Sequence, residues 1–393
     1  MTDYLGQDIP KLGFGLMRLP KRPRREGEPR PAGAASGARD MVTDVDQVKQ
    51  MVDEFLTAGF TYFDTARAYG DSEEVIRQAL VERYPRESYQ LATKNAAWLG
   101  AKNAEDAKAM LETSLKNTGA GYFDFYLLHS LGGSRTQVFE DYGMWEWVAR
   151  QKDAGLVKHV GISFHDRAPQ LKEVLDQHGD QIEFVQLQIN YSDWDDAYVQ
   201  SGANYRLCRE YGKPVIVMEP VKGGTLAKLP AAAEALLRQA DPGASIPSWA
   251  VRFAASLPNV KMVLSGMSST EQLLDNTGYM QDFAPLTQQE QAVIAQVVDI
   301  INASIAIPCT GCSYCTEGCP MHIAIPKYFS LYNAEIQELK EKDFTSQGTY
   351  YGNLTQTFGK ASDCIACGQC ESVCPQHLPI IENLKRVAKQ FEA

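Results

Sequence analysis

Short apolar segments alternate with longer segments of helical periodicity through most of the chain. Eight strands are predicted, at 11–16, 62–63, 90–93, 123–128, 158–162, 184–189, 214–218 and 262–264. Helices are predicted between them, the first at 46–58 and the last at 270–277. This α/β pattern fits a parallel (β/α)8 barrel of the TIM type. A doubly wound sheet is the competing fold, but no glycine-rich phosphate fingerprint follows the first strand.

The net charge of the chain argues against two classes of binding partner. The 393 residues carry a formal net charge of -11, which argues against nucleic acid or an anionic membrane as a partner. The first residues have no basic and apolar regions of a secretory signal, and no apolar run approaches the ~18 residues of a membrane helix. We therefore expect a cytoplasmic protein with a small-molecule substrate.

Residues 21–40 interrupt the alternation. They contain six Lys and Arg residues among several Pro, Gly and Ala, a composition that cannot form a core. We predict a loop inserted into the barrel. Three roles stay open: a solvated surface loop, a flap over the active-site mouth, or a docking patch for an acidic redox partner.

Polar side chains follow three of the predicted strands. Asp64 ends the second strand and Tyr69 follows five residues later, while Lys94 and His129 end the third and fourth strands. A barrel presents such groups together at its C-terminal face. Tyr69 is the candidate proton donor, and we expect the Lys94 ammonium to lower its pKa from the usual value of about 10. Asp64 would hold Lys94, and His129 would orient a carbonyl or share the proton.

With these four residues in this order, the segment from Lys11 to Asn276 resembles the aldo-keto reductase family. The resemblance implies reduction of an aldehyde or ketone with NADP(H) or NAD(H), with Tyr69 as general acid. It also implies cofactor contacts, which fall at Ser163, Gln186, Met218, Val221, Gly223, Gly266, Met267, Ser268, Gln272 and Asn276.

Two of these positions depart from the family pattern. Met218 stands where the family often stacks a Tyr on the nicotinamide. Gly266 and Gln272 stand where members that prefer NADP commonly carry Lys and Arg, and a phosphate dianion without a cationic partner is poorly held. We predict a weak cofactor preference or one tilted to NADH, unless Arg18 or an Arg of the 21–40 loop supplies the charge.

Eight of the nine cysteines follow residue 308, in two runs of the same spacing. The first run is Cys309, Cys312, Cys315 and Cys319, and the second is Cys364, Cys367, Cys370 and Cys374, each followed by Pro. This is the bacterial ferredoxin spacing for [4Fe-4S] clusters, in which the fourth cysteine of a run ligates the other cluster. Zinc is the alternative for four-cysteine sites, but it rarely uses this spacing twice. The module resembles two-cluster ferredoxin domains. We interpret the remaining Cys208 as a buried helix residue.

We therefore predict three parts: a barrel at 1–284, a linking helix at 285–306, and a ferredoxin-like module at 307–393 whose long insert forms a helix at 327–340. The main hypothesis is nicotinamide-dependent carbonyl reduction, with clusters that exchange electrons with the barrel or with an electron-transfer protein partner. A second hypothesis is a one-electron redox enzyme, with a flavin as its cofactor, in which the clusters feed a substrate in the barrel. A third is a non-catalytic redox sensor. Clusters that only brace the fold stay an alternative.

Overall fold

Eight parallel strands close into a barrel in this computed structural model, which describes residues 9–25, 41–196, 199–337 and 346–392 together with Leu5 and Glu28. The strands follow the closed order β1-β10-β9-β8-β7-β6-β5-β4. They are β1 (Leu12–Gly15), β4 (Tyr62–Asp64), β5 (Gln90–Asn95), β6 (Phe123–Leu131), β7 (Val157–Phe164), β8 (Phe184–Gln188), β9 (Val215–Met218) and β10 (Val260–Ser265). The predicted (β/α)8 fold is confirmed.

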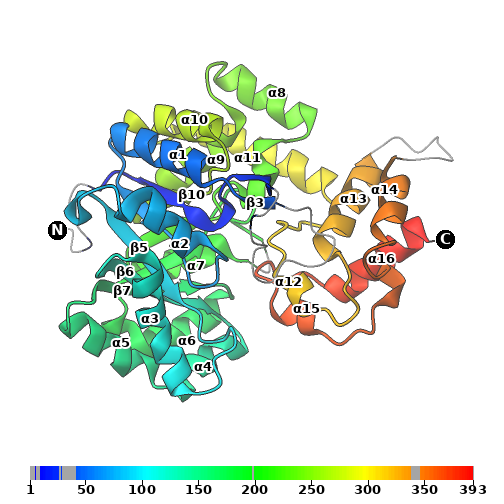
Figure 1. The fold of residues 1–393 in the computed structure, drawn as a ribbon. Helices are drawn as coiled ribbons and strands as arrows, with labels where there is room; N and C mark the ends of the chain where they lie inside the picture. The colour runs from blue at the N-terminus through cyan, green and yellow to red at the C-terminus, as the bar shows by residue number, and fades with distance from the viewer. Residues whose placement is uncertain are drawn as a thin grey trace.

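Helices surround the barrel (Figure 1). They are α1 (Val45–Thr57), α2 (Ser72–Ile76), α3 (Ala104–Thr118), α4 (Ser134–Asp141), α5 (Met144–Asp153), α6 (Ala168–His178), α7 (Ser201–Glu210), α8 (Ala231–Ala240), α9 (Ile246–Ala255) and α10 (Thr270–Gln281). Side-chain caps begin several of them, because an oxygen at the cap satisfies an otherwise free backbone N–H. Asp44, Asn103 and Ser269 accept such bonds at α1, α3 and α10.

Two apolar layers hold the barrel. Outside the sheet, side chains of the strands pack against the helices in one large buried cluster. Inside it, Tyr62, Phe125 and Phe184 fill the barrel, and Leu5 packs with them. Gly161 is required here, because a Cβ at this position would overlap the ring of Phe184. The interior is therefore a packed core and leaves the functional groups to the ends of the strands.

The predicted 21–40 loop is only partly a loop. Residues Lys21–Pro23 (β2) pair antiparallel with Met41–Thr43 (β3), so the prediction was wrong for its first three residues. Lys21 Nζ donates to Thr43 Oγ1 at 2.5 Å, and Arg22 pairs with Glu28. Lys21 and Arg22 thus have polar partners, although the composition of this segment predicted a loop. Residues 26–27 and 29–40 lie outside the described residues.

A helical module follows the barrel. Helix α11 (Gln288–Ser304) packs on α8 and α9 of the barrel and leads into α12 (Tyr314–Glu317), α13 (Ile325–Gln337), α14 (Ser346–Leu354), α15 (Gln369–Ser372) and α16 (Ile380–Phe391). The predicted helix at 327–340 begins at Ile325, and its residues 338–340 lie outside the described part. The module has its own core, which contains three of the cysteines.

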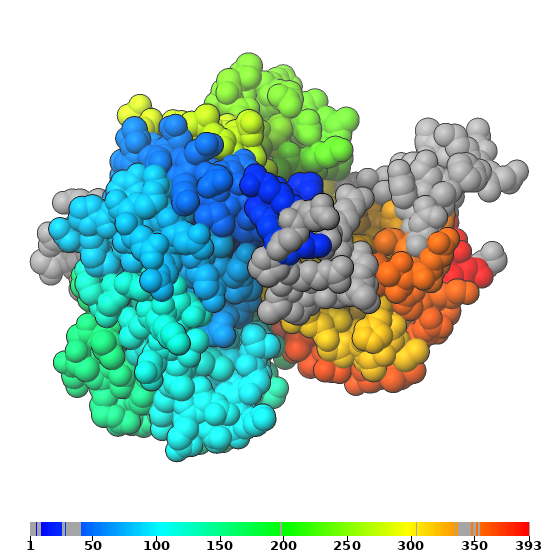
Figure 2. All heavy atoms as spheres, viewed as in Figure 1, coloured from blue at the N-terminus to red at the C-terminus, as the bar shows by residue number. Residues whose placement is uncertain are grey.

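The module lies beside the barrel, with α12 and α15 toward it (Figures 1 and 2). Arg135, in the helix that follows β6, donates to the carbonyl oxygen of Ser372 at 3.3 Å. His377 Nε2 lies 4.0 Å from Asp166, which follows β7. Because both barrel residues follow the C-terminal ends of strands, the module covers part of the face where barrel sites form. No helix in the described part of the chain is long and apolar enough to cross a bilayer.

Candidate active site and cysteine-lined cavities

The four predicted catalytic side chains meet at the C-terminal ends of β4, β5 and β6. Lys94 Nζ donates to Asp64 Oδ1 at 2.5 Å, to the Thr65 carbonyl at 2.8 Å and to the Tyr69 hydroxyl at 3.3 Å. The ring of His129 lies 5.8 Å from that of Tyr69, measured between centroids. The parallel register explains the meeting, because the ends of neighbouring strands share one edge.

Burial sets the protonation of the Asp64–Lys94 pair. The two side chains are 4% and 1% exposed. Burial raises the pKa of the Asp64 carboxyl and lowers that of the Lys94 ammonium, and the attraction between the two charges opposes both shifts. Each charge therefore depends on its partner.

The expectation that Lys94 lowers the pKa of Tyr69 was wrong. Burial raises the pKa of Tyr69 well above its usual value, the charges of Asp64 and Glu219 raise it further, and Arg18 opposes them. The Lys94 charge is offset by Asp64 at 2.5 Å. Tyr69 is therefore fully protonated at neutral pH and able to donate a proton.

His129 is neutral. Burial lowers its pKa well below the usual value, and the positive charges of Lys94 and Arg135 contribute. Trp98 Nε1 donates to the backbone carbonyl of His129 at 2.8 Å, which fixes the residue. Its Nδ1 is buried without a hydrogen-bond partner among the described residues. A neutral imidazole at this point can orient a carbonyl without competing as the acid.

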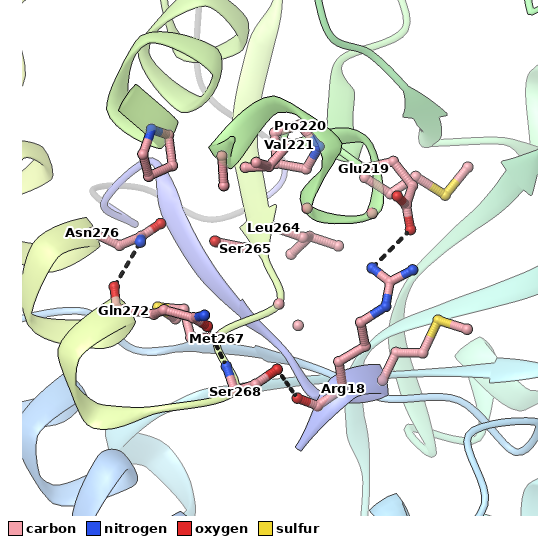
Figure 3. A pocket seen from close by; sticks show the side chains of 18 of the residues that line it. Arg18, Glu219, Pro220, Val221, Leu264, Ser265, Met267, Ser268, Gln272 and Asn276 are labelled. Carbon is pink, nitrogen blue, oxygen red and sulfur yellow. Dashed lines mark hydrogen bonds and ion pairs between the residues drawn. The ribbon is translucent and has the colours of Figure 1, made fainter. Parts of the chain in front are cut away.

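A groove of about 250 Å³ adjoins the tetrad. Figure 3 shows the part of its wall formed by the start of α10 and by the residues that follow β9. Two residues of the tetrad, Asp64 and Tyr69, line this groove. All the predicted cofactor residues except Ser163 line it: Gln186, Met218, Val221, Gly223, Gly266, Met267, Ser268, Gln272 and Asn276. The groove therefore connects the proton donor with the positions that the family resemblance assigned to a nucleotide.

Several of these side chains are already held by neighbours. Gln186 Nε2 donates to Asp64 Oδ2 at 3.3 Å, and its Oε1 is buried without a partner among the described residues. Gln272 Oε1 accepts from the backbone N–H of Ser268 at 2.7 Å, and Asn276 Nδ2 donates to the Gln272 carbonyl at 2.6 Å. Ser163 lies apart, buried, with its Oγ accepting from Ser130 N–H at 2.7 Å. The free acceptor of Gln186 fits a carboxamide N–H of a nicotinamide.

Two charged residues that the sequence did not assign as cofactor ligands cross the groove (Figure 3). Arg18 Nη1 lies 3.4 Å from Glu219 Oε1. Arg18 is the only cation among the described residues that line the groove, which makes it the charge source considered from the sequence. Glu219 has a left-handed backbone, with φ of 55°, and its Oε2 is buried without a partner among the described residues. The sequence did contain one indication that Glu219 belongs to the site, because it directly follows the strand predicted at 214–218.

The eight clustered cysteines line two small cavities. Cys309, Cys312, Cys315 and Cys374 line the first, which we call the proximal cavity. Cys319, Cys364, Cys367 and Cys370 line the second, which we call the distal cavity. Each run thus gives its last cysteine to the cavity of the other run.

The cysteine geometry fits a cluster better than a single ion. Among the described residues, no three His, Cys, Asp or Glu side chains are placed as they would be around one metal ion. Four cysteines spaced around a cavity suit a cubane, whose irons stand at separate corners. The N–H of Gly311 also points to Cys309 Sγ at 3.4 Å, the kind of bond that tunes cluster sulfurs. Cys208 is buried in α7, as predicted.

Comparison with known proteins matches both parts of the chain. The family model described as "Aldo/keto reductase family" matches residues 11–299, and the one described as "4Fe-4S dicluster domain" matches residues 308–378. An aldo-keto reductase of Mycolicibacterium vanbaalenii is 34% identical over 121 residues, which are 30% of this chain and 41% of the relative. An NAD/NADP-dependent indole-3-acetaldehyde reductase of Schizosaccharomyces pombe is 32% identical over 133 residues, 34% of this chain and 43% of the relative.

The aligned part therefore spans less than half the length of these two relatives. A solved structure of an aldo-keto reductase from Bacillus halodurans, in its holo form, superposes with a TM-score of 0.55 and 24% identity. It covers 73% of this chain and 91% of its own. This likeness supports the barrel fold.

Proposed function

This chain belongs to the aldo/keto reductase family and carries a 4Fe-4S dicluster domain behind the barrel, and we propose that it is an oxidoreductase that reduces the carbonyl group of an aldehyde or ketone. NAD(P)H is the proposed cofactor in the groove, and two [4Fe-4S] clusters are proposed in the proximal and distal cavities. We propose a cytoplasmic setting, a small-molecule substrate and an electron-transfer protein as partner.

One observation carries the proposal. The Tyr69 hydroxyl lies 3.3 Å from Lys94 Nζ, and Tyr69 lines the same groove as most of the expected cofactor positions. A proton donor and a nucleotide groove that meet at one point are what carbonyl reduction requires, because the carbon and the oxygen of the carbonyl receive their new atoms together.

Each side chain of the site has its own proposed role in carbonyl reduction. When bound, the nicotinamide would supply the hydride, which with one proton completes the reduction, and the clusters would carry single electrons between the barrel and an electron-transfer partner. Tyr69 donates its hydroxyl proton to the carbonyl oxygen, and Lys94, which donates to the Tyr69 oxygen at 3.3 Å, holds that hydroxyl in place. Asp64 keeps Lys94 charged and in place, at 2.5 Å. Neutral His129 orients the carbonyl, and Gln186 holds the carboxamide of the nicotinamide.

The position of the module supports a role for the clusters in turnover. The proximal cavity adjoins the wall of the groove, since Thr310, which lines that cavity, packs against Gly223 of the groove. A module that only stabilised the barrel would not need to place the proposed cluster of the proximal cavity next to the groove. Electron exchange with the barrel is therefore the function we propose for it.

The substitution Tyr69→Phe tests the mechanism. It removes the only proposed acid and keeps the ring, so we expect carbonyl reduction to fall at least about 100-fold while nicotinamide binding stays nearly unchanged. Steady-state rates and fluorescence titration with NADPH and NADH measure the two effects. Tyr211→Phe is the matched control, because its hydroxyl bonds Asp176 near the surface and Tyr211 is not among the residues that line the groove. Near-normal turnover of Tyr69→Phe, or extraction of a flavin instead of a nicotinamide, would overturn the proposal.

A further inference from the structure

The walls of the groove and of the proximal cavity touch at one glycine, where Gly223 lies against Thr310. Gly223 lines the groove, in the short turn Lys222–Ala227 that follows β9. A Cβ at this position would overlap the carbonyl oxygen of Thr310 and would lie 3.5 Å from Arg18 Nη2. Gly223 therefore stands between the cation of the groove and the loop of the first cysteine run, with no room for a side chain.

The groove side of this contact is fixed. Lys222 and Gly223 both have left-handed backbones, with φ of 48° and 66°. Lys222 is buried and forms an ion pair with Asp193, which is also buried. Asp193 in turn accepts from Gln188 and Asn190 at 2.9 and 2.7 Å. These contacts anchor the turn to the neighbouring loop.

The cavity side is equally constrained. Thr310 is 5% exposed and lies between Cys309 and Cys312, and all three line the proximal cavity. The cysteines flank it within two residues, so a change in their positions must move its carbonyl. Among the described residues, those that line the distal cavity include neither Thr310 nor any residue of the turn.

We propose that Gly223 is a positioning residue that couples nucleotide binding in the groove to the redox state of the proximal cluster. This inference rests on the proposed function, which puts NAD(P)H, a dinucleotide joined by a pyrophosphate, in the groove on one side of the turn and a cluster in the proximal cavity on the other. A pyrophosphate and a one-electron reduction each add negative charge near the same buried contact. These charges repel in a poorly screened interior, and the repulsion is strongest while the Thr310 loop lies against the turn, a close approach that only a glycine at position 223 permits.

The sign of the coupling follows. Reduction of the proximal cluster weakens nucleotide binding, and a bound nucleotide makes that cluster harder to reduce. Linkage requires the two effects to be equal, because both measure one coupling free energy. The consequence for the enzyme is that a reduced proximal cluster promotes release of the nucleotide.

The experiment uses the full-length protein with its clusters, under anaerobic conditions, and ADP-ribose as the probe. ADP-ribose carries the pyrophosphate and has no nicotinamide, so dithionite cannot reduce it. Calorimetry gives its affinity for the oxidised protein and for protein reduced with dithionite. We expect ADP-ribose to bind about tenfold more weakly after reduction, which is within the usual range of coupling between sites.

A potentiometric titration followed by EPR measures the same coupling from the side of the cluster. We expect bound ADP-ribose to lower the reduction potential of the proximal cluster by about 59 mV, because for one electron this shift corresponds to a tenfold change in affinity.

Two glycine variants test the residue itself. Gly223→Ala and Gly224→Ala both place a Cβ on a left-handed residue of the groove wall, but a Cβ at Gly224 meets nothing within 4 Å. We expect Gly223→Ala to reduce the affinity ratio to below about twofold and Gly224→Ala to keep it near tenfold. Loss of iron in Gly223→Ala alone would also support the contact, because only this variant displaces Thr310.

Other outcomes overturn the inference. Equal affinities of the oxidised and reduced wild-type protein would refute the coupling. The same loss of linkage in both variants would refute the assignment to Gly223. Failure of the proposed function is distinct: the wild-type protein would then bind no ADP-ribose or hold no iron before any linkage is measured.

Discussion

Replacing Asp64 by Asn should destabilise the barrel in a way that depends on pH. The substitution leaves Lys94, whose side chain is 1% exposed, without its counter-charge. Removing one partner of a buried ion pair costs about 3–5 kcal/mol. At pH 7 the amine can instead release its proton, which costs about 5 kcal/mol, because pH 7 lies about 3.5 units below the usual Lys pKa of 10.5. The two routes agree on the magnitude.

The sign with pH follows from the pKa of Lys94. Burial lowers this pKa in the folded protein, and loss of Asp64 lowers it further, whereas the unfolded chain keeps the usual value. Between the two pKa values the unfolded state binds more protons, so the stability of the variant rises with pH. At pH 9 we expect the deficit in the free energy of unfolding to shrink to about 2 kcal/mol.

Thermal unfolding followed by circular dichroism, under anaerobic conditions, measures this deficit. About 2 °C of Tm corresponds to 1 kcal/mol in a domain of this size, so the expected deficit is about 10 °C at pH 7 and about 4 °C at pH 9. Asp176→Asn is the control, because its partner Lys172 and Asp176 itself are about half exposed. It should change Tm little at either pH. A deficit of Asp64→Asn that is constant or grows between pH 7 and 9 would refute the reasoning.

Two further predictions concern the cofactors. Anaerobic fluorescence titration should give affinities for NADH and NADPH within about tenfold of each other, because Arg18 is the only cation lining the groove among the described residues; a hundredfold preference for NADPH would contradict this. Cys315→Ala should lower the iron content from about eight to about four atoms, whereas Cys208→Ala should keep about eight. If Cys315→Ala protein still folds and turns over normally with nicotinamide, the clusters brace the fold and do not serve turnover.

The barrel was predictable because each strand and helix carries its own periodicity. The strands β5 to β8 begin and end within three residues of the predicted ranges. Helix α4 (Ser134–Asp141) was missed, because it has only one buried residue and so lacks an apolar face. The strand at Lys21–Pro23 was missed for a similar reason: its partner is three residues long, and no apolar alternation marks either segment.

The chemistry of the site was only partly predictable. The identity of the tetrad and of the groove residues could be predicted, because both were matched to the family by their order along the sequence. The pKa of Tyr69 could not, because it depends on how much solvent the fold removes and on Glu219, which lies 150 positions further along the chain. The Arg18–Glu219 pair likewise joins residues 201 positions apart. Only closure of the barrel, with β1 and β9 on either side of β10, brings them together.

Each cysteine run contributes its last cysteine to the cavity of the other run. This crossing brings residues of both runs that contact the barrel close to one cavity. Thr310, from the first run, packs against Gly223. Ser372 and His377, which flank Cys374 of the second run, contact Arg135 and approach Asp166. Cys374 lines the proximal cavity together with three cysteines of the first run, and Thr310, Ser372 and His377 each lie within three residues of one of these cysteines. Without the crossing, the residues that touch the barrel would belong to two different sites. The crossing therefore places these three contacts beside cysteines of one cavity, whereas the described residues that line the other cavity, with its exposed Cys367, include none of the three.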